Sequence, residues 1–77
     1  MKTLQNKTEV PTLKEAQQYI GGYVERLILP NGDILLFDED GKEKNLNLNE
    51  KASKLATVII VGNVIHIPAS LKSKKWR

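Results

Sequence analysis

Apolar residues recur at helical spacing near the start of the chain, in the stretch "TLKEAQQYI". Leu13, Ala16 and Ile20 are separated by three and four positions and therefore share one face of a helix. Thr12 can accept a hydrogen bond at the N-terminal end, and Glu15 three residues later completes a capping box. These residues predict an amphipathic helix that begins after Thr12.

Gly21 and Gly22 come directly after this helix, where they could turn the chain or hold an anion. Glycines that bind phosphate precede a helix, because its free N–H groups then face the anion. The C-terminal end of a helix instead presents free carbonyl groups and partial negative charge. We therefore predict that Gly21 closes the helix in the left-handed conformation and that Gly22 eases the turn into a strand. The alternative is a close approach of the backbone to a ligand or partner.

Two runs of strand-forming residues follow, "YVERLIL" and "ILLF", with Asn31 and Gly32 between them. An Asn-Gly pair is a strong hairpin signal, so the two strands are predicted to be antiparallel. Pro30 has no N–H to donate and belongs at the end of the first strand. The stretch "DEDG" then predicts a second turn.

The remaining pattern predicts a second helix and further strand. The helix lies in "LNLNEKASKLA", with Asn47 or Asn49 as its N-cap. The run "TVIIVGNVIHIP" is typical of strand, either one long strand with a bulge at Gly62 or two strands joined at Gly62 and Asn63. Pro68 ends this run. The apolar residues that share one face of the predicted helix are Leu48, Ala52, Leu55 and Ala56.

The order β-α-β-β-α-β predicts an α+β fold, with two short helices packed on a small, mostly antiparallel sheet of three to four strands. Residues 1–11 are expected to be a flexible N-terminus or a short strand, residues 12–68 a single α+β domain, and residues 69–77 a basic tail that is flexible or loosely docked. A chain of 77 residues buries only about 60% of its unfolded surface, so a homodimer would add stability.

The composition narrows the function classes. The chain has no cysteine, which excludes disulfides, thiolate zinc sites and a cysteine nucleophile. No apolar run approaches the roughly 20 residues that span a bilayer, and "MKTLQNKTEV" lacks the apolar stretch of a signal peptide. We therefore expect a cytoplasmic protein that does not contact a membrane.

The positive charge is concentrated at the two ends of the chain. Residues 1–14 carry three lysines against one glutamate, residues 72–77 carry four basic residues, and the segment between them is acidic. A basic tail with a tryptophan could bind a nucleic acid strand, with bases stacked on the indole and phosphates on the cations. The alternative is a solubilising or docked tail. The residues in question are Lys74, Lys75, Trp76 and Arg77.

No constellation of residues predicts catalysis. His66 is the only histidine, and nothing in the sequence marks a nucleophile or a carboxylate near it. The stretch "DEDGKEKNLNLNE" lacks the glycine and the acidic residue of a calcium loop at their required positions. Asp38 and Asp40 could at most hold a magnesium ion weakly. We expect no enzyme activity, no cofactor and no metal site.

Two tyrosines flank the glycine pair, and tyrosine is frequent at protein interfaces. Tyr19, Tyr23 and Arg26 are therefore candidate contact residues. A purely structural role is the alternative for the two tyrosines. The residues assigned to the fold itself are Thr12, Glu15, Gly21, Gly22, Asn31, Gly32 and Gly62.

Four stretches taken in order, "LKEAQQYIGGYVERL", "ILLFDEDGK", "LNLNEKAS" and "IIVGNVIHI", resemble a family of small domains of unknown function encoded by bacteriophages and plasmids. The resemblance covers about residues 12–67, and the lysine-rich tail and the N-terminus depart from it. It supplies no activity and no catalytic residues. It implies an accessory role on a mobile genetic element.

Together, these observations favour a non-catalytic binding protein with an accessory or counter-defence role. Its partner would be a host protein, or a small ligand that it sequesters. The counter-defence role rests on analogy with other small phage proteins. The alternative is a nucleic-acid-binding accessory protein that uses its basic termini and Trp76.

Overall fold

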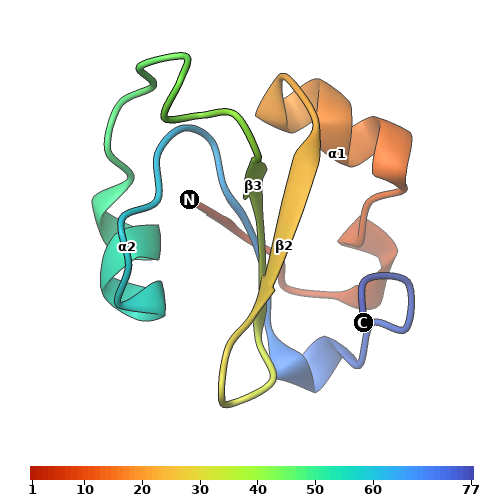
Figure 1. Cartoon of the computed structure of the whole chain (residues 1–77). Coiled ribbons are helices and arrows are strands. Elements are labelled where there is room, and N and C mark those ends of the chain that lie inside the picture. Colours follow the sequence, from red (N-terminus) through yellow and green to blue (C-terminus); the bar gives the residue numbers. More distant parts are fainter.

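A four-stranded mixed sheet separates two helices in the computed structural model, which describes all 77 residues (Figure 1). The strands lie in the order β1-β4-β3-β2; β2–β3 and β3–β4 are antiparallel, and β1–β4 is parallel. The predicted α+β fold is thus confirmed. The elements are β1 (Lys2–Thr3), α1 (Leu13–Ile20), β2 (Val24–Ile28), β3 (Ile34–Asp38), α2 (Glu50–Ala56) and β4 (Ile65–Ile67), with 3₁₀ helices at Lys7–Glu9 and Ala69–Leu71.

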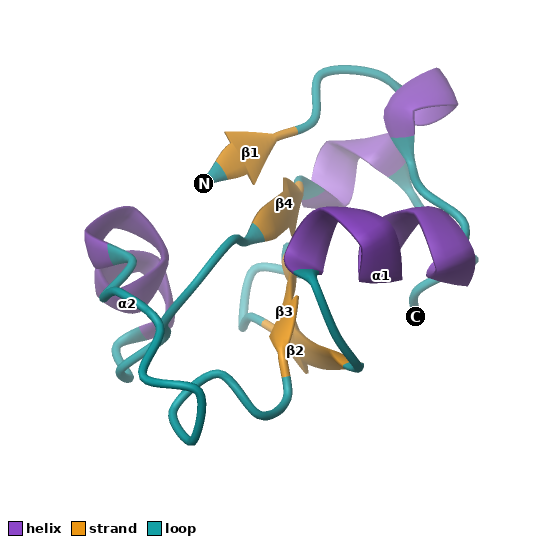
Figure 2. Cartoon of the chain, turned by 90° about the horizontal axis from the view of Figure 1, so that it is seen from above, coloured by secondary structure: helices purple, strands orange, loops and turns teal.

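The two helices cover opposite faces of the sheet (Figures 1 and 2). Successive residues of a strand point to alternate faces. Ile34 and Leu36 of β3 therefore pack with Ala16 and Ile20 of α1, whereas Leu35 packs with the α2 side. The sheet thus has two small cores rather than one.

Helix α1 begins and ends as the local sequence predicts. Thr12 Oγ1 accepts a hydrogen bond from the Glu15 N–H (3.2 Å), and Glu15 Oε1 accepts one from the Thr12 N–H (2.9 Å). Gly21 has φ +89°, and its N–H donates to the Gln17 carbonyl (2.8 Å). This left-handed residue satisfies a carbonyl of the last turn and reverses the chain toward β2.

The hairpin between β2 and β3 has a longer loop than a two-residue Asn-Gly turn. The Gly32 N–H donates to the Leu29 carbonyl (2.9 Å), and the Leu29 N–H donates to the Asp33 carbonyl (2.8 Å). The loop therefore comprises Pro30, Asn31 and Gly32, with Gly32 at φ +91°. A three-residue hairpin loop with glycine in the left-handed region matches this arrangement.

The segment before β4 leaves the sheet, contrary to both interpretations of the apolar run. Only Ile65–Ile67 forms strand, and Val61 makes a single bridge to Leu48. Ser53 of α2 explains the difference, because its hydroxyl donates to the Ile60 carbonyl (3.0 Å) and accepts from the Ile60 N–H (2.8 Å). These two bonds satisfy backbone groups of Ile60 that a neighbouring strand would otherwise bind.

Asn49, the second of the two proposed caps, begins α2. Its Oδ1 accepts from the Ala52 N–H (3.1 Å), and its Nδ2 donates to the Gly62 carbonyl (3.0 Å). Leu48 therefore lies before the helix and is exposed, rather than on its inner face. Neither α1 nor α2 is long and apolar enough to cross a membrane.

We predict that Leu35→Ala and Leu36→Ala each lower the free energy of unfolding by about 2–5 kcal/mol, because both side chains are fully buried, on opposite faces of the sheet. Urea unfolding of the two variants measures this loss. Ile59→Ala is the control; this residue is 64% exposed, and we expect a change within about 0.5 kcal/mol. A loss below about 1 kcal/mol for either leucine would show that its face of the sheet is not a core.

Candidate functional site

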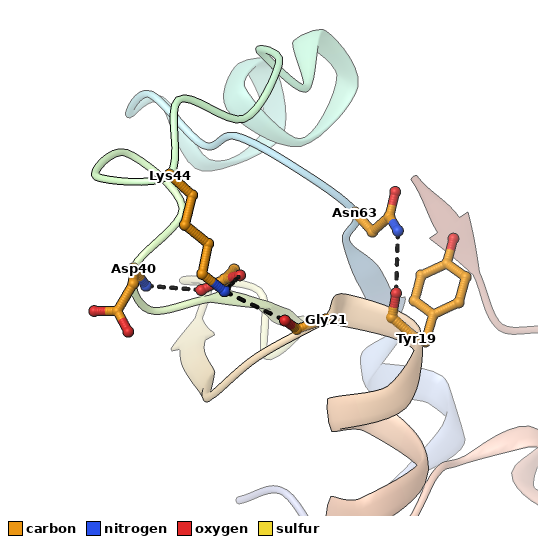
Figure 3. A network of polar contacts seen from close by, with 6 residues as sticks. Tyr19, Gly21, Asp40, Lys44 and Asn63 are labelled. Carbon is orange, nitrogen blue, oxygen red and sulfur yellow. Dashed lines mark hydrogen bonds and ion pairs between the residues drawn. The ribbon is translucent and has the colours of Figure 1, made fainter.

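Lys44, in the loop after β3, forms an ion pair with Asp38 and a hydrogen bond with the end of α1 (Figure 3). Lys44 Nζ donates to Asp38 Oδ2 (2.7 Å) and to the Gly21 carbonyl (3.3 Å). The Asp40 N–H donates to the other Asp38 oxygen (2.8 Å). Asp38 and Lys44 therefore serve the fold, and Asp40 meets Asp38 through its backbone rather than its carboxylate.

The surroundings of Gly22 explain why two glycines stand here. A Cβ at Gly22 would lie 2.6 Å from Lys44 Nζ and 3.0 Å from Asp38 Oδ2. Gly21 instead has open space around it and needs glycine for its positive φ. The pair therefore has two structural causes: Gly21 reverses the chain, and Gly22 leaves room for the ion pair.

His66 lies between two polar partners that the sequence did not reveal. Its Nε2 is 2.8 Å from Asp33 Oδ2, and its Nδ1 is 3.1 Å from Thr3 Oγ1. Burial raises the pKa of the Asp33 carboxyl, but the Ala69 N–H and the His66 ring outweigh burial and hold that pKa below its usual value.

A hydroxyl, an imidazole and a carboxylate in a row resemble the parts of a catalytic triad. None of the four hollows of the surface is lined by Thr3, Asp33 or His66. The array links β1, β4 and the β2–β3 hairpin, which is a structural use. No group of three His, Asp or Glu side chains is placed to hold a metal ion.

The structure does not gather the candidate contact residues Tyr19, Tyr23 and Arg26 into one patch. The Tyr19 ring lies 5.4 Å from the ammonium of Lys2 in β1, whereas Arg26 belongs to β2 at the opposite edge of the sheet. Tyr23 is 69% exposed. The Tyr19 carbonyl accepts from Asn63 Nδ2 (3.0 Å; Figure 3), so the end of α1 is also fixed to the segment before β4.

The tail lies against the body of the domain. Trp76 packs on the core of the α1 face, and its Nε1 donates to the Pro11 carbonyl (2.9 Å). Arg26 Nη1 donates to the Trp76 carbonyl (3.0 Å). Trp76 therefore anchors the tail, and base stacking on its indole stays a prediction that would need an accessible face of the ring.

An apolar groove lies over the α2 face of β2 and β3. Its cavity has a volume of about 380 Å³ and is lined by the apolar residues Leu27, Phe37 and 58–61. Val58 and Ile59 are adjacent apolar residues, yet they are 56% and 64% exposed. Adjacent exposed apolar side chains beside a cavity are typical of a surface that another molecule covers. Its charged lining, apart from Asp38, is Glu25, Glu39, Glu43 and Lys42.

The outer edge of β2 borders this groove and has no neighbouring strand. The Glu39 N–H donates to the Tyr23 carbonyl, and the Leu29 N–H donates to the Asp33 carbonyl. The backbone N–H and C=O groups of the odd-numbered residues of β2 therefore bond to β3. Those of residues 24, 26 and 28 point outward. Such an edge can accept an extended segment of another chain.

A second hollow lies between the N-terminal 3₁₀ helix and the tail. Its lining combines Lys7 from the N-terminal 3₁₀ helix with Lys72, Lys74 and Lys75 from the tail, and its volume is about 420 Å³. The sequence showed two basic ends but not that Lys7 and the tail lysines line one hollow. Sequence reasoning also missed Val58 and Ile59, because its strand assignment could not show that they remain exposed.

Comparisons of the chain with models of protein families, with curated proteins and with solved structures gave no match. The resemblance to phage- and plasmid-encoded domains therefore stays a prediction. The geometry of the chain itself is the basis for a functional proposal.

We predict that Lys44→Gln destabilises the protein by about 1–3 kcal/mol near neutral pH, because the buried Asp38 carboxylate loses its charged partner. The hydrogen bond from Lys44 lowers the pKa of Asp38. It outweighs burial, which raises that pKa, and so the pKa lies below its usual value. A lowered folded-state pKa stabilises the fold above the unfolded-state pKa, and this contribution is lost as the pH falls.

The difference between wild type and Lys44→Gln should therefore shrink as the pH falls below about 4. Urea unfolding across this pH range measures it. Lys42→Gln, two residues away and without an ion pair in the structure, is the control and should change stability by less than about 0.5 kcal/mol. A difference that stays constant with pH would rule out Asp38 as the group responsible.

Proposed function

We propose that the protein is a non-catalytic binding protein that recognises another protein through the apolar groove. One observation carries the proposal: Val58 and Ile59 are adjacent in the sequence and exposed, and they line the same cavity as the more buried Leu27, Phe37 and Ile60. Covering these side chains would remove apolar surface from water at about 25 cal/mol per Å². The unpaired edge of β2 beside the groove adds backbone donors and acceptors for the same partner.

The charges around the groove favour a basic partner. Three glutamates and one lysine line it, while Asp38 is neutralised by Lys44. Complementary charge steers the encounter and selects among partners more than it adds affinity. The expected target is therefore a segment with apolar side chains flanked by lysine or arginine. The resemblance to mobile-element domains supports a host protein as that target and an accessory role for the complex.

Selection from a displayed peptide library tests the chemistry of the groove directly. We expect the wild-type protein to enrich peptides that combine apolar residues with lysine or arginine. Ile59→Asp should weaken the binding of those peptides by about tenfold or more, because it places a charge at the centre of the apolar contact. The amide NMR spectrum of the variant should otherwise match that of the wild type.

Leu13→Asp is the matched control for this measurement. Leu13 is also exposed (56%) and apolar, but it lies at the start of α1, on the other face of the sheet. The variant therefore introduces the same charge at a distance from the groove. Enrichment of acidic or charge-free peptides, or an equal loss of binding in the two variants, would refute the groove as the binding surface.

A further inference from the structure

We infer that the hollow between the N-terminal 3₁₀ helix and the tail is a binding site for phosphate groups, and that its ligands carry two or more adjacent phosphates. This site goes beyond the proposed function. Val10 and Leu71, which line the hollow, pack against the core of the α1 face, whereas the apolar groove lies on the α2 face. The two surfaces can therefore be tested separately.

The hollow concentrates positive charge from distant parts of the sequence. Lys7 comes from the beginning of the chain, and Lys72, Lys74 and Lys75 come from its end. No acidic residue is among the seven that line the hollow. Four lysines that line one concavity concentrate positive charge there, and that charge attracts a ligand with several negative charges.

The backbone that carries these lysines is held in place before any ligand arrives. Asn6 and Glu9 form a capping box around the 3₁₀ helix that contains Lys7. On the other side, the anchoring of Trp76 to Pro11 fixes the end of the tail. A ligand therefore meets lysines whose backbone is already positioned, which lowers the entropic cost of binding.

Ser73 adds a second, independent observation. It lines the hollow between two of the lysines, and the residue is only 8% exposed. Its Oγ is the only buried side-chain polar atom of the chain without a hydrogen-bond partner. Such an atom calls for an explanation. After rotation of the side chain, the Ser73 hydroxyl could donate a hydrogen bond to a phosphate oxygen.

The number of lysines favours a polyphosphate or a nucleic acid strand over a single phosphate. Glu9 and Glu15 are not among the residues that line the hollow. The negative charge of Glu15 acts on Lys75 and offsets part of its charge. The other three lysines leave the hollow with an excess of positive charge. Tripolyphosphate, ATP and oligonucleotides share the recognised chemistry, adjacent phosphate groups, and differ in what else they carry.

The test is an NMR titration of the full chain with inorganic phosphate, tripolyphosphate, ATP and a short oligothymidylate. We expect saturable shifts concentrated in residues 6–10 and 71–76, and weaker binding of inorganic phosphate than of the other probes. Similar affinities for tripolyphosphate, ATP and the oligonucleotide would assign the site to polyphosphate groups in general. Tighter binding of the oligonucleotide would assign the site to a nucleic acid strand. If each of the four lysines contacts one phosphate, its affinity should fall about 600-fold for a tenfold rise in salt concentration.

Charge reversal separates this site from general attraction to a basic protein. The double variant Lys74→Glu, Lys75→Glu should lose at least tenfold in affinity for the best probe. The control Lys51→Glu, Lys54→Glu makes the same charge change on the exposed side of α2 and should lose less than threefold. Removal of residues 72–77 is a poorer test, because it also removes the Trp76 anchor.

Three results would overturn the inference: no saturable binding of any probe, shifts spread evenly over the surface, or equal losses in the two double variants. All four substituted lysines are exposed, so both double variants should retain the wild-type fold. Amide spectra of the free proteins verify this before the titrations are compared.

Discussion

Consecutive apolar side chains in β3 point to opposite faces of the sheet, so this strand is stable only when both faces are covered. Ile34, Leu35 and Leu36 are all buried in a chain of 77 residues. The chain must therefore divide its limited apolar content between two thin cores. One helix covers each face, and neither helix is long enough to complete its core alone. Other segments have to contribute, and which segments do so determines what remains exposed.

The two faces are completed differently, and the two candidate surfaces follow from that difference. On the α1 face, Leu4 from the beginning of the chain and Leu71 and Trp76 from its end add to the core. This packing places Lys7 beside the basic tail and creates the lysine-lined hollow. On the α2 face, residues Ile60 and Val64 complete the core, while Val58 and Ile59 remain outside it. The apolar groove is thus the part of the second core that the chain leaves uncovered.

Local interactions were predictable from the sequence, and distant ones were not. The capping of α1 by Thr12 and Glu15 and its closure by Gly21 involve residues within about one helical turn, so residue type and spacing carry the information. The Asn-Gly pair predicted the hairpin for the same reason, although Pro30 extends its loop.

The features that the sequence did not predict share one physical cause: contacts between residues far apart in the chain determine them. Ser53 engages the backbone of Ile60 and overrides strand propensity. Trp76 meets Pro11 across 65 positions, and His66 meets Asp33 across 33. A linear pattern of apolar residues does not tell which of them a small domain leaves exposed, so the groove and the hollow appear only in the folded chain.

The arrangement of charge also bears on whether a second copy of the chain could fill the groove. The charged residues that line the groove are mainly glutamates, and the complementary lysines of the same chain lie in the hollow on the other face of the sheet. A contact between the groove of one copy and the hollow of another would use different surfaces on the two copies. Such contacts do not close into a dimer but continue from copy to copy. A homodimer would instead require like surfaces to meet, which at the groove means glutamates against glutamates. Charge therefore favours a different, basic protein in the groove.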